Sequence, residues 1–256
     1  HLCDRRQRQM CIRDRYTSFV KPVAYSMDGY YFLKFNLAYA AIHPLTQEEF
    51  LTKYPFLVVF HEKGELIEFR FDVLKRVFLS DKKEPTIYSN LIAEMSDYFK
   101  EHFECDLIPL NLDFMVNVCK RDENVKLIAQ SMKLPNGGNA QLDVGNNQEY
   151  ILPFIGELRS LLNDNQAELE KVPDFREALE QFMFEMEEMS DYPWIELLWE
   201  NEIKTRSNRV KFVFNYMNKS YCLIQYYYSN VLIGMERMNY VIEYIVNHLS
   251  LIHISE

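Results

Sequence analysis

The chain has 256 residues, of which 48% are hydrophobic and 14% aromatic, a composition typical of a globular protein and not of a disordered one. Its 28 Lys and Arg stand against 38 Asp and Glu, giving a net charge of −10. An acidic chain is a poor candidate for binding nucleic acid, because that affinity comes mainly from basic side chains that displace counterions from phosphates.

The two ends of the chain are related at the level of DNA. The first 15 residues include the arginine-rich stretch RRQRQMCIRDR, which imitates a nucleic-acid-binding arm. One DNA spelling of the final LSLIHISE begins CTG TCT CTT ATA CAC AT, and its reverse complement reads Met-Cys-Ile-Arg-Asp, the sequence of residues 10–14. A reading frame cut by sequencing adapters explains this relation, whereas protein chemistry does not.

We therefore interpret residues 1–15 and 249–256 as translated sequencing adapter and exclude them from reasoning about the fold. The exclusion removes five arginines and only three acidic residues, so the rest of the chain is more acidic still. We also expect residues 16–248 to be a segment of a larger truncated protein. They carry no family pattern that we recognise.

Cysteine spacing and hydropathy indicate the compartment. Between the two ends lie Cys105, Cys119 and Cys222, with no CxxC pair. This spacing indicates neither a disulfide framework nor a zinc ribbon, so we expect a reducing compartment, the cytoplasm. The longest uncharged run, residues 220–235, contains polar residues and is shorter than a bilayer requires, so we expect no membrane span.

Residues 16–134 are predicted to form a strand-rich α+β region. Residues 29–42 are an aromatic, partly alternating run, which is typical of a strand. Residues 55–71 place two apolar runs around Gly64, which predicts a β-hairpin with glycine in its turn.

Two helices are expected within this region. Thr46 precedes two glutamates at capping-box spacing, which predicts a short helix through Tyr54. Apolar residues then recur at helical spacing over residues 86–103. Residues 106–134 fit a second hairpin or a pair of helices, and the Asp and Asn turn residues favour strands.

A change in composition marks the predicted boundary. Residues 135–149 contain three of the seven glycines and several asparagines, which predicts a loop. Residues 150–248 are predicted to be helical throughout, beginning with one helix over residues 150–162 and a second over residues 173–189.

The rest of the helical part is expected to hold a short helix from Pro193 and a long helical segment over residues 208–248, broken near Lys219 or Gly234. The fold class predicted for the whole chain is α+β, with a strand-rich N-terminal part followed by a helical layer or bundle.

Catalytic motifs are not found. The HE pair at His61 does not continue as HExxH, and neither a P-loop nor a GxSxG motif is present. The cluster HFECD at residues 102–106 lacks a second pair of metal ligands. Glu202 and Lys204 have the ExK spacing of metal-dependent nucleases, but they fall at an expected helix end. We therefore assign no catalytic, metal-binding or cofactor-binding residue.

Two patterns suggest an interaction surface. Over residues 175–189 a Phe and Met stripe recurs at helical spacing beside glutamates, and it is either a docking face or part of the core. Three consecutive tyrosines on a helix point in three directions, so at least one should meet solvent, a partner chain or a polar core group. The candidate contact residues are Phe182, Met183, Met186, Tyr226, Tyr227 and Tyr228.

These observations predict a non-catalytic protein-interaction or scaffold segment with a protein partner and no nucleic acid. The alternative is a fragment of an enzyme, a hydrolase or metal-dependent nuclease, whose active site is completed by missing sequence. A pocket that gathers His102, Glu104 and Asp106, or Glu202 with Lys204, would favour the enzyme.

Overall fold

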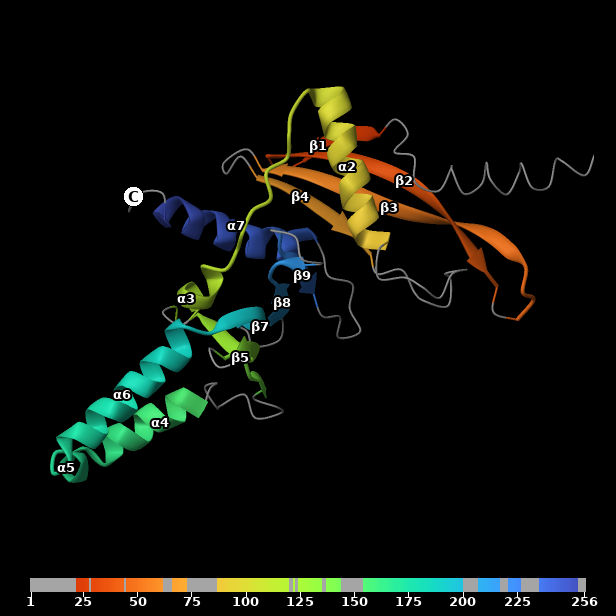
Figure 1. The fold of residues 1–256 in the computed structure, drawn as a ribbon. Coiled ribbons are helices and arrows are strands. Elements are labelled where there is room, and N and C mark those ends of the chain that lie inside the picture. Colours follow the sequence, from red (N-terminus) through yellow and green to blue (C-terminus); the bar gives the residue numbers. More distant parts are fainter. Residues whose placement is uncertain are drawn as a thin grey trace, which may run out of the picture. The chain divides into compact units, whose positions relative to one another are not determined.

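The computed structural model describes residues 22–27, 29–43, 45–61, 66–72, 87–119, 122, 124–134, 137–143, 154–199, 207–216, 221–226 and 235–252. The chain divides into two compact units, residues 1–108 and 109–256. Each unit contains one antiparallel sheet, which is accompanied by one described helix in the first unit and by several in the second, so the predicted α+β class is confirmed (Figure 1). Residues 1–15, interpreted as adapter, lie outside the described part of the chain.

The first unit contains a four-stranded sheet in the order β1-β2-β3-β4. Its strands are β1 (Val23–Met27), β2 (Tyr30–Ile42), β3 (Glu49–His61) and β4 (Leu66–Phe71). The chain turns from β1 into β2 at Gly29, whose φ of +81° costs glycine little. β3 and β4 pair antiparallel, which confirms the predicted hairpin, although Gly64 itself lies outside the described residues.

The short helix predicted through Tyr54 is wrong. Thr46 Oγ1 accepts the backbone N–H of Glu48 at 3.4 Å and Gln47 has a φ of +57°, so this segment forms a turn. β3 begins at Glu49 and pairs with β2 along 13 residues. Extended cross-strand pairing thus prevails over a local capping pattern.

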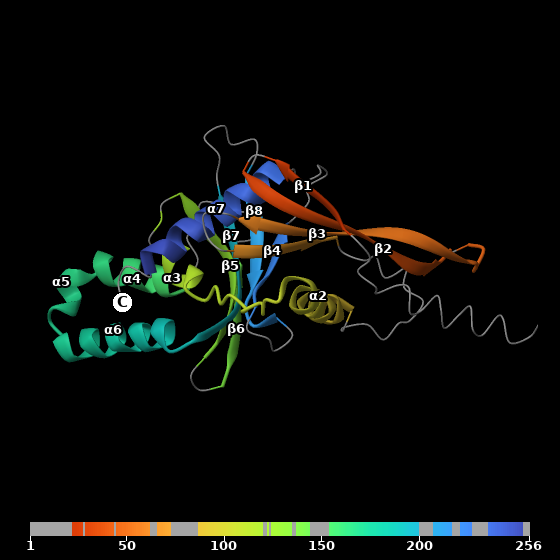
Figure 2. The same cartoon turned by 90° about the horizontal axis from the view of Figure 1, so that it is seen from above.

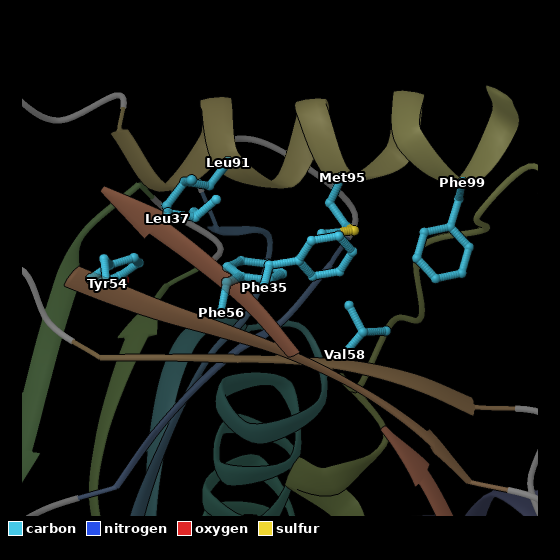
Figure 3. Close-up of a cluster of buried hydrophobic side chains, with 8 residues drawn as sticks. All are labelled: Phe35, Leu37, Tyr54, Phe56, Val58, Leu91, Met95 and Phe99. Atoms are coloured by element: carbon cyan, nitrogen blue, oxygen red, sulfur yellow. The ribbon is translucent and has the colours of Figure 1, made fainter. Parts of the chain in front are cut away.

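Helix α2 (Ile87–Phe103) confirms the helix predicted over residues 86–103 and packs on one face of the sheet (Figure 3). Leu91, Met95 and Phe99 recur every four residues and are buried against the strands, because that spacing keeps them on one side of a helix. The strands contribute alternate residues to the same core. Its buried members are Phe35, Leu37, Tyr54, Phe56, Val58, Leu91, Met95 and Phe99.

The second unit contains a five-stranded sheet in the order β6-β5-β7-β8-β9. Its strands are β5 (Val125–Lys133), β6 (Asn139–Asp143), β7 (Asp191–Trp199), β8 (Asn208–Val213) and β9 (Leu223–Tyr226). Its helices are α3 (Met115–Cys119), α4 (Phe154–Asp164), α5 (Gln166–Leu169), α6 (Pro173–Glu188) and α7 (Met235–Ile252). α7 packs on one sheet face, where the rings of Trp199 and Tyr244 contact each other edge to face, with their centroids 5.5 Å apart.

The sequence is only partly helical after residue 150. α4 and α6 confirm the two helices predicted there, and α7 begins directly after Gly234. The helix predicted from Pro193 is wrong, because this segment is β7, and the first half of the long helix predicted over residues 208–248 is replaced by β8 and β9. β7 lies between β5 and β8 and is buried from Ile195 to Trp199, so it lacks the alternation that marks a half-exposed strand.

The segment between the two predicted halves also differs from expectation. Of the hairpin expected within residues 106–134, the first arm is the short helix α3 and only the second is a strand, β5. β5 pairs instead with β6, which lies inside the predicted loop of residues 135–149, and with β7. α7 continues to Ile252, so it includes the start of the C-terminal residues that we interpret as adapter.

Candidate functional site

α4, α5 and α6 form a helical hairpin, residues 154–189, inserted between β6 and β7. α4 and α6 run in opposite directions and extend away from the sheet (Figures 1 and 2). α6 starts with Pro173, which suits the first helical position because its missing N–H would be unpaired there anyway. At the other end, Ser190 Oγ donates to the carbonyl oxygen of Met186 at 2.6 Å, which satisfies one of the last carbonyls of the helix.

The apolar stripe of α6 has one covered flank and one exposed flank. Met183 is buried, at 3% exposure, and Leu179 and Met186 are half-buried. Beside them lies a row of three residues that remain 60%, 47% and 63% exposed, namely Phe175, Phe182 and Met189. These three are spaced by seven residues, slightly under two turns, so they share one side of the helix. We call them the exposed row.

The opposite side of α6 carries another exposed phenylalanine. Phe184 is 57% exposed, and because it follows Phe182 by two residues it lies about 200° around the helix. Glu177, seven residues before Phe184, is exposed on the same side. Phe184 and Glu177 therefore provide internal controls for any function of the exposed row.

The helical hairpin is strongly acidic. It contains ten acidic and three basic residues, against a net charge of −10 for all 256 residues. The acidic residues are Glu157, Asp164, Glu168, Glu170, Asp174, Glu177, Glu180, Glu185, Glu187 and Glu188. Two of the basic residues are held in ion pairs within the hairpin, Lys171 with Glu168 at 2.6 Å and Arg176 with Glu180 at 2.8 Å.

The structure brings together only part of the predicted interaction set. Phe182, Met183 and Met186 share α6, but Met183 belongs to the buried flank and only Phe182 lies in the exposed row. Tyr226 lies on β9, half-buried, and its hydroxyl donates to the carbonyl oxygen of Met238 on α7 at 3.4 Å. Tyr227 and Tyr228 lie outside the described residues.

The residues named for the alternative enzyme do not converge where the structure describes them. His102 stacks on Tyr98, with the ring centroids 4.0 Å apart. Asp106 instead forms a surface ion pair with Lys100, with 3.2 Å between Oδ1 and Nζ. Glu104 adopts a φ of +53° at the end of α2. Within the described residues no three His, Cys, Asp or Glu side chains are grouped as metal ligands. Glu202 and Lys204 lie outside the described part of the chain.

A shallow hollow of about 300 Å³ lies beside β1 and β2 in the first unit. Its lining is aromatic and aliphatic, with one serine. The lining residues are Ala24, Tyr25, Ser26, Tyr31, Phe32, Leu33 and Phe60. The described residues that line it include no carboxylate and no imidazole.

Sequence reasoning missed a buried polar cluster on the sheet face of the first unit opposite α2. The Glu68 carboxylate accepts two hydrogen bonds from Arg70, at 2.8 Å from Nε and 2.7 Å from Nη2, and lies 3.0 Å from His61 Nε2. Burial alone would raise the pKa of Glu68, but its hydrogen bonds with His61 and Arg70 outweigh burial and hold that pKa below its usual value. The signal was the i, i+2 spacing of Glu68 and Arg70 along β4, which places both on one face of the strand, with His61 of β3 diagonal to Glu68.

A second polar contact joins α7 to the segment just before β5. The Tyr244 hydroxyl donates to Asp122 Oδ2 at 2.7 Å, and Asp122 Oδ1 accepts the backbone N–H of Asn124 at 2.9 Å. Partial burial would raise the pKa of Asp122, but these hydrogen bonds lower it overall. The arrangement ties two distant parts of the chain together, as a structural contact does.

No family model, curated protein or solved structure matches the chain. None of the helices in the described part of the chain is both long and apolar enough to span a membrane. The exposed row places two phenylalanines and a methionine on one side of α6 and its C-terminal end.

Proposed function

We propose that the chain is a non-catalytic protein-interaction segment that docks a partner protein on α6. The observation that carries the proposal is the exposed row, in which Phe175 and Phe182 stand 60% and 47% exposed on one side of a helix whose neighbouring flank is buried. Aromatic side chains aligned on a helix face provide the anchors of many helix-mediated interfaces.

The exposed apolar area of the row is large enough to contribute several kcal/mol to binding. A phenylalanine side chain buries ~200 Å² when fully covered. Covering the exposed parts of Phe175 and Phe182 therefore removes about 200 Å² of apolar surface from water, a gross gain of about 5 kcal/mol. Part of this gain is offset by the loss of translational and rotational freedom on association, so the row acts as the centre of a larger interface.

A helical-peptide display library selected against the full chain tests the proposal. Binders should lose affinity by tenfold or more, a change of about 1.4 kcal/mol, when Phe182→Ser is introduced, and should keep it with Phe184→Ser. Both substitutions remove an exposed phenylalanine from the same helix, so only the side of the helix differs. Docking on α6 would be refuted if neither substitution changed the affinity of the selected peptides, or if the library yielded no binding peptide.

We further propose the cytoplasm as the compartment in which this interaction takes place. The cysteines in the described part of the chain, Cys105, Cys119 and Cys222, form no disulfide with one another. Burial raises the pKa of the Cys222 thiol, so it stays protonated and poorly reactive at neutral pH. Thiols that are not oxidised to disulfides support a reducing environment.

A further inference from the structure

We infer that the occupant of the exposed row is a cationic amphipathic helix of a partner protein. This inference rests on the proposed docking function and adds the chemistry of the partner. It follows from the charges that surround the row and from the shape of the row along α6.

Acidic side chains border the exposed row directly. Glu185 follows Phe182 by three residues and precedes Met189 by four, and both spacings place side chains next to each other on a helix. Asp174 precedes Phe175 in the first turn, where successive side chains point about 100° apart around the axis. Glu185 and Asp174 are both exposed, so a ligand covering the row brings its own side chains up to these carboxylates.

Charge also determines which occupants the row disfavours. The helical hairpin has ten acidic residues and three basic ones, so a second copy of the same surface would bring like charges together. Such repulsion costs free energy at every contact, whereas lysine or arginine on a partner turns the same positions into attractive pairs. A basic partner therefore fits this face better than another copy of the chain does.

The shape of the row favours a helix as the docked element. Phe175 and Met189 are separated by 14 positions, which corresponds to about 21 Å along the axis of α6. A partner helix of about the same length places apolar residues at i, i+3, i+4 and i+7 along the row, and its polar flank then faces the acidic border.

Three labelled peptides of about 18 residues, long enough to form helices, test the inference by fluorescence anisotropy with the full chain. All three share leucine at i, i+3, i+4 and i+7, and their remaining positions hold lysine with glutamine, glutamate with glutamine, or glutamine alone. The lysine peptide should bind at least about tenfold more tightly than the neutral one, and the glutamate peptide more weakly than either. Raising the salt from about 0.05 M to about 0.5 M should reduce the advantage of lysine, because exposed charges are then screened.

Matched variants separate specific docking from a general attraction between opposite charges. Glu185→Lys, beside the exposed row, should weaken binding of the lysine peptide several-fold more than Glu177→Lys, which makes the same charge change on the opposite side. Phe182→Ser should abolish binding of this peptide, and Phe184→Ser should leave it intact. Each variant is checked for unchanged helix content by circular dichroism before binding is measured.

The outcomes distinguish the inference from the function on which it rests. If all three peptides bind equally and all require Phe182, the cationic partner is refuted while docking on α6 stands. If no peptide binding depends on Phe182, docking on α6 is refuted as well. Equal losses from Glu185→Lys and Glu177→Lys would show attraction to the net charge alone and would also overturn the inference. Self-association through the row, detected by sedimentation and abolished by Phe182→Ser, would make a second copy the occupant instead.

Discussion

Replacing Glu68 with glutamine should destabilise the first unit although it changes only one atom of the side chain. The Glu68 carboxylate accepts two hydrogen bonds from Arg70 and contacts His61, and the Glu68 side chain is 14% exposed. Glutamine offers one oxygen and one amide nitrogen, and Arg70 donates to both oxygens of Glu68, so the nitrogen must direct its N–H groups at an N–H of Arg70. The substitution therefore removes a negative charge and also places two donors against each other.

The magnitude follows from the bonds that are lost. A hydrogen bond to a charged group contributes about 1.5 to 3 kcal/mol, and Arg70, with a side chain 6% exposed, keeps its positive charge in a buried position. Breaking one partner of a buried ion pair typically costs about 3 to 5 kcal/mol. Because glutamine preserves one acceptor, we expect Glu68→Gln to lower the free energy of unfolding by about 3 kcal/mol at neutral pH.

Hydrogen exchange of the full chain, read in peptides from β3 and β4, measures this loss where it arises. The second substitution Arg70→Met should restore part of the stability, because no buried cation then remains without its carboxylate. The pH dependence gives an independent check. The pKa of Glu68 is lowered in the folded state, so its contribution is full above the unfolded value of 4.5 and is lost as the pH falls through the folded pKa. A loss below about 0.5 kcal/mol, or protection that does not change on acidification, would refute the reasoning.

Three further predictions concern the remaining contacts. Met95→Ala, at a position with 0% exposure, should cost about 3 kcal/mol by chemical denaturation, because it leaves a cavity under α2. Tyr244→Phe should cost about 1 kcal/mol, reduced by solvent at the partly exposed Asp122, and tryptophan fluorescence should detect it because Trp199 lies 5.5 Å from that ring. Phe182→Ser should cost at most about 2.5 kcal/mol in the same assay, less than Met95→Ala, since only about half of this side chain is covered.

The helices of this fold were the elements that the sequence predicted best. α2 and α6 each place apolar residues at three- and four-residue intervals over at least four turns. This periodicity can be recognised in the sequence without knowing which element packs on the helix. Strand segments of the first unit were recognised where apolar residues alternate with charged ones, as in β4. Local patterns therefore identified these elements because each one gathers most of its apolar residues on one face.

The second sheet was missed for the converse reason. β7 is buried on both faces between its two neighbours, so its near-continuous apolar run looks like a buried helix as much as a strand. β8 did carry a usable signal, because Val210 and Phe212 are buried while Arg209 and Lys211 alternate with them. At four residues, β9 is too short for any period to be recognised.

The candidate site was predictable in its chemistry but not in its exposure. The sequence shows that α6 has an apolar side and an acidic side, but it does not show how much of the apolar side is covered. Met183 and Phe182 are adjacent in sequence and similar in hydrophobicity, yet one is 3% and the other 47% exposed. The cluster of Glu68 with His61 was equally hidden, since it depends on the register between β3 and β4.

The helical hairpin combines exposed phenylalanines with many negative charges, and these two features affect association with other surfaces in different ways. Exposed aromatic residues alone promote contact with any apolar surface, including other copies of the chain. The acidic residues around them oppose contact with another acidic surface and favour contact with a basic one. In the docking that we propose, the exposed row contributes affinity and the charges contribute selectivity, so loss of Phe182 should weaken binding, whereas reversal of Glu185 should change which partner is preferred.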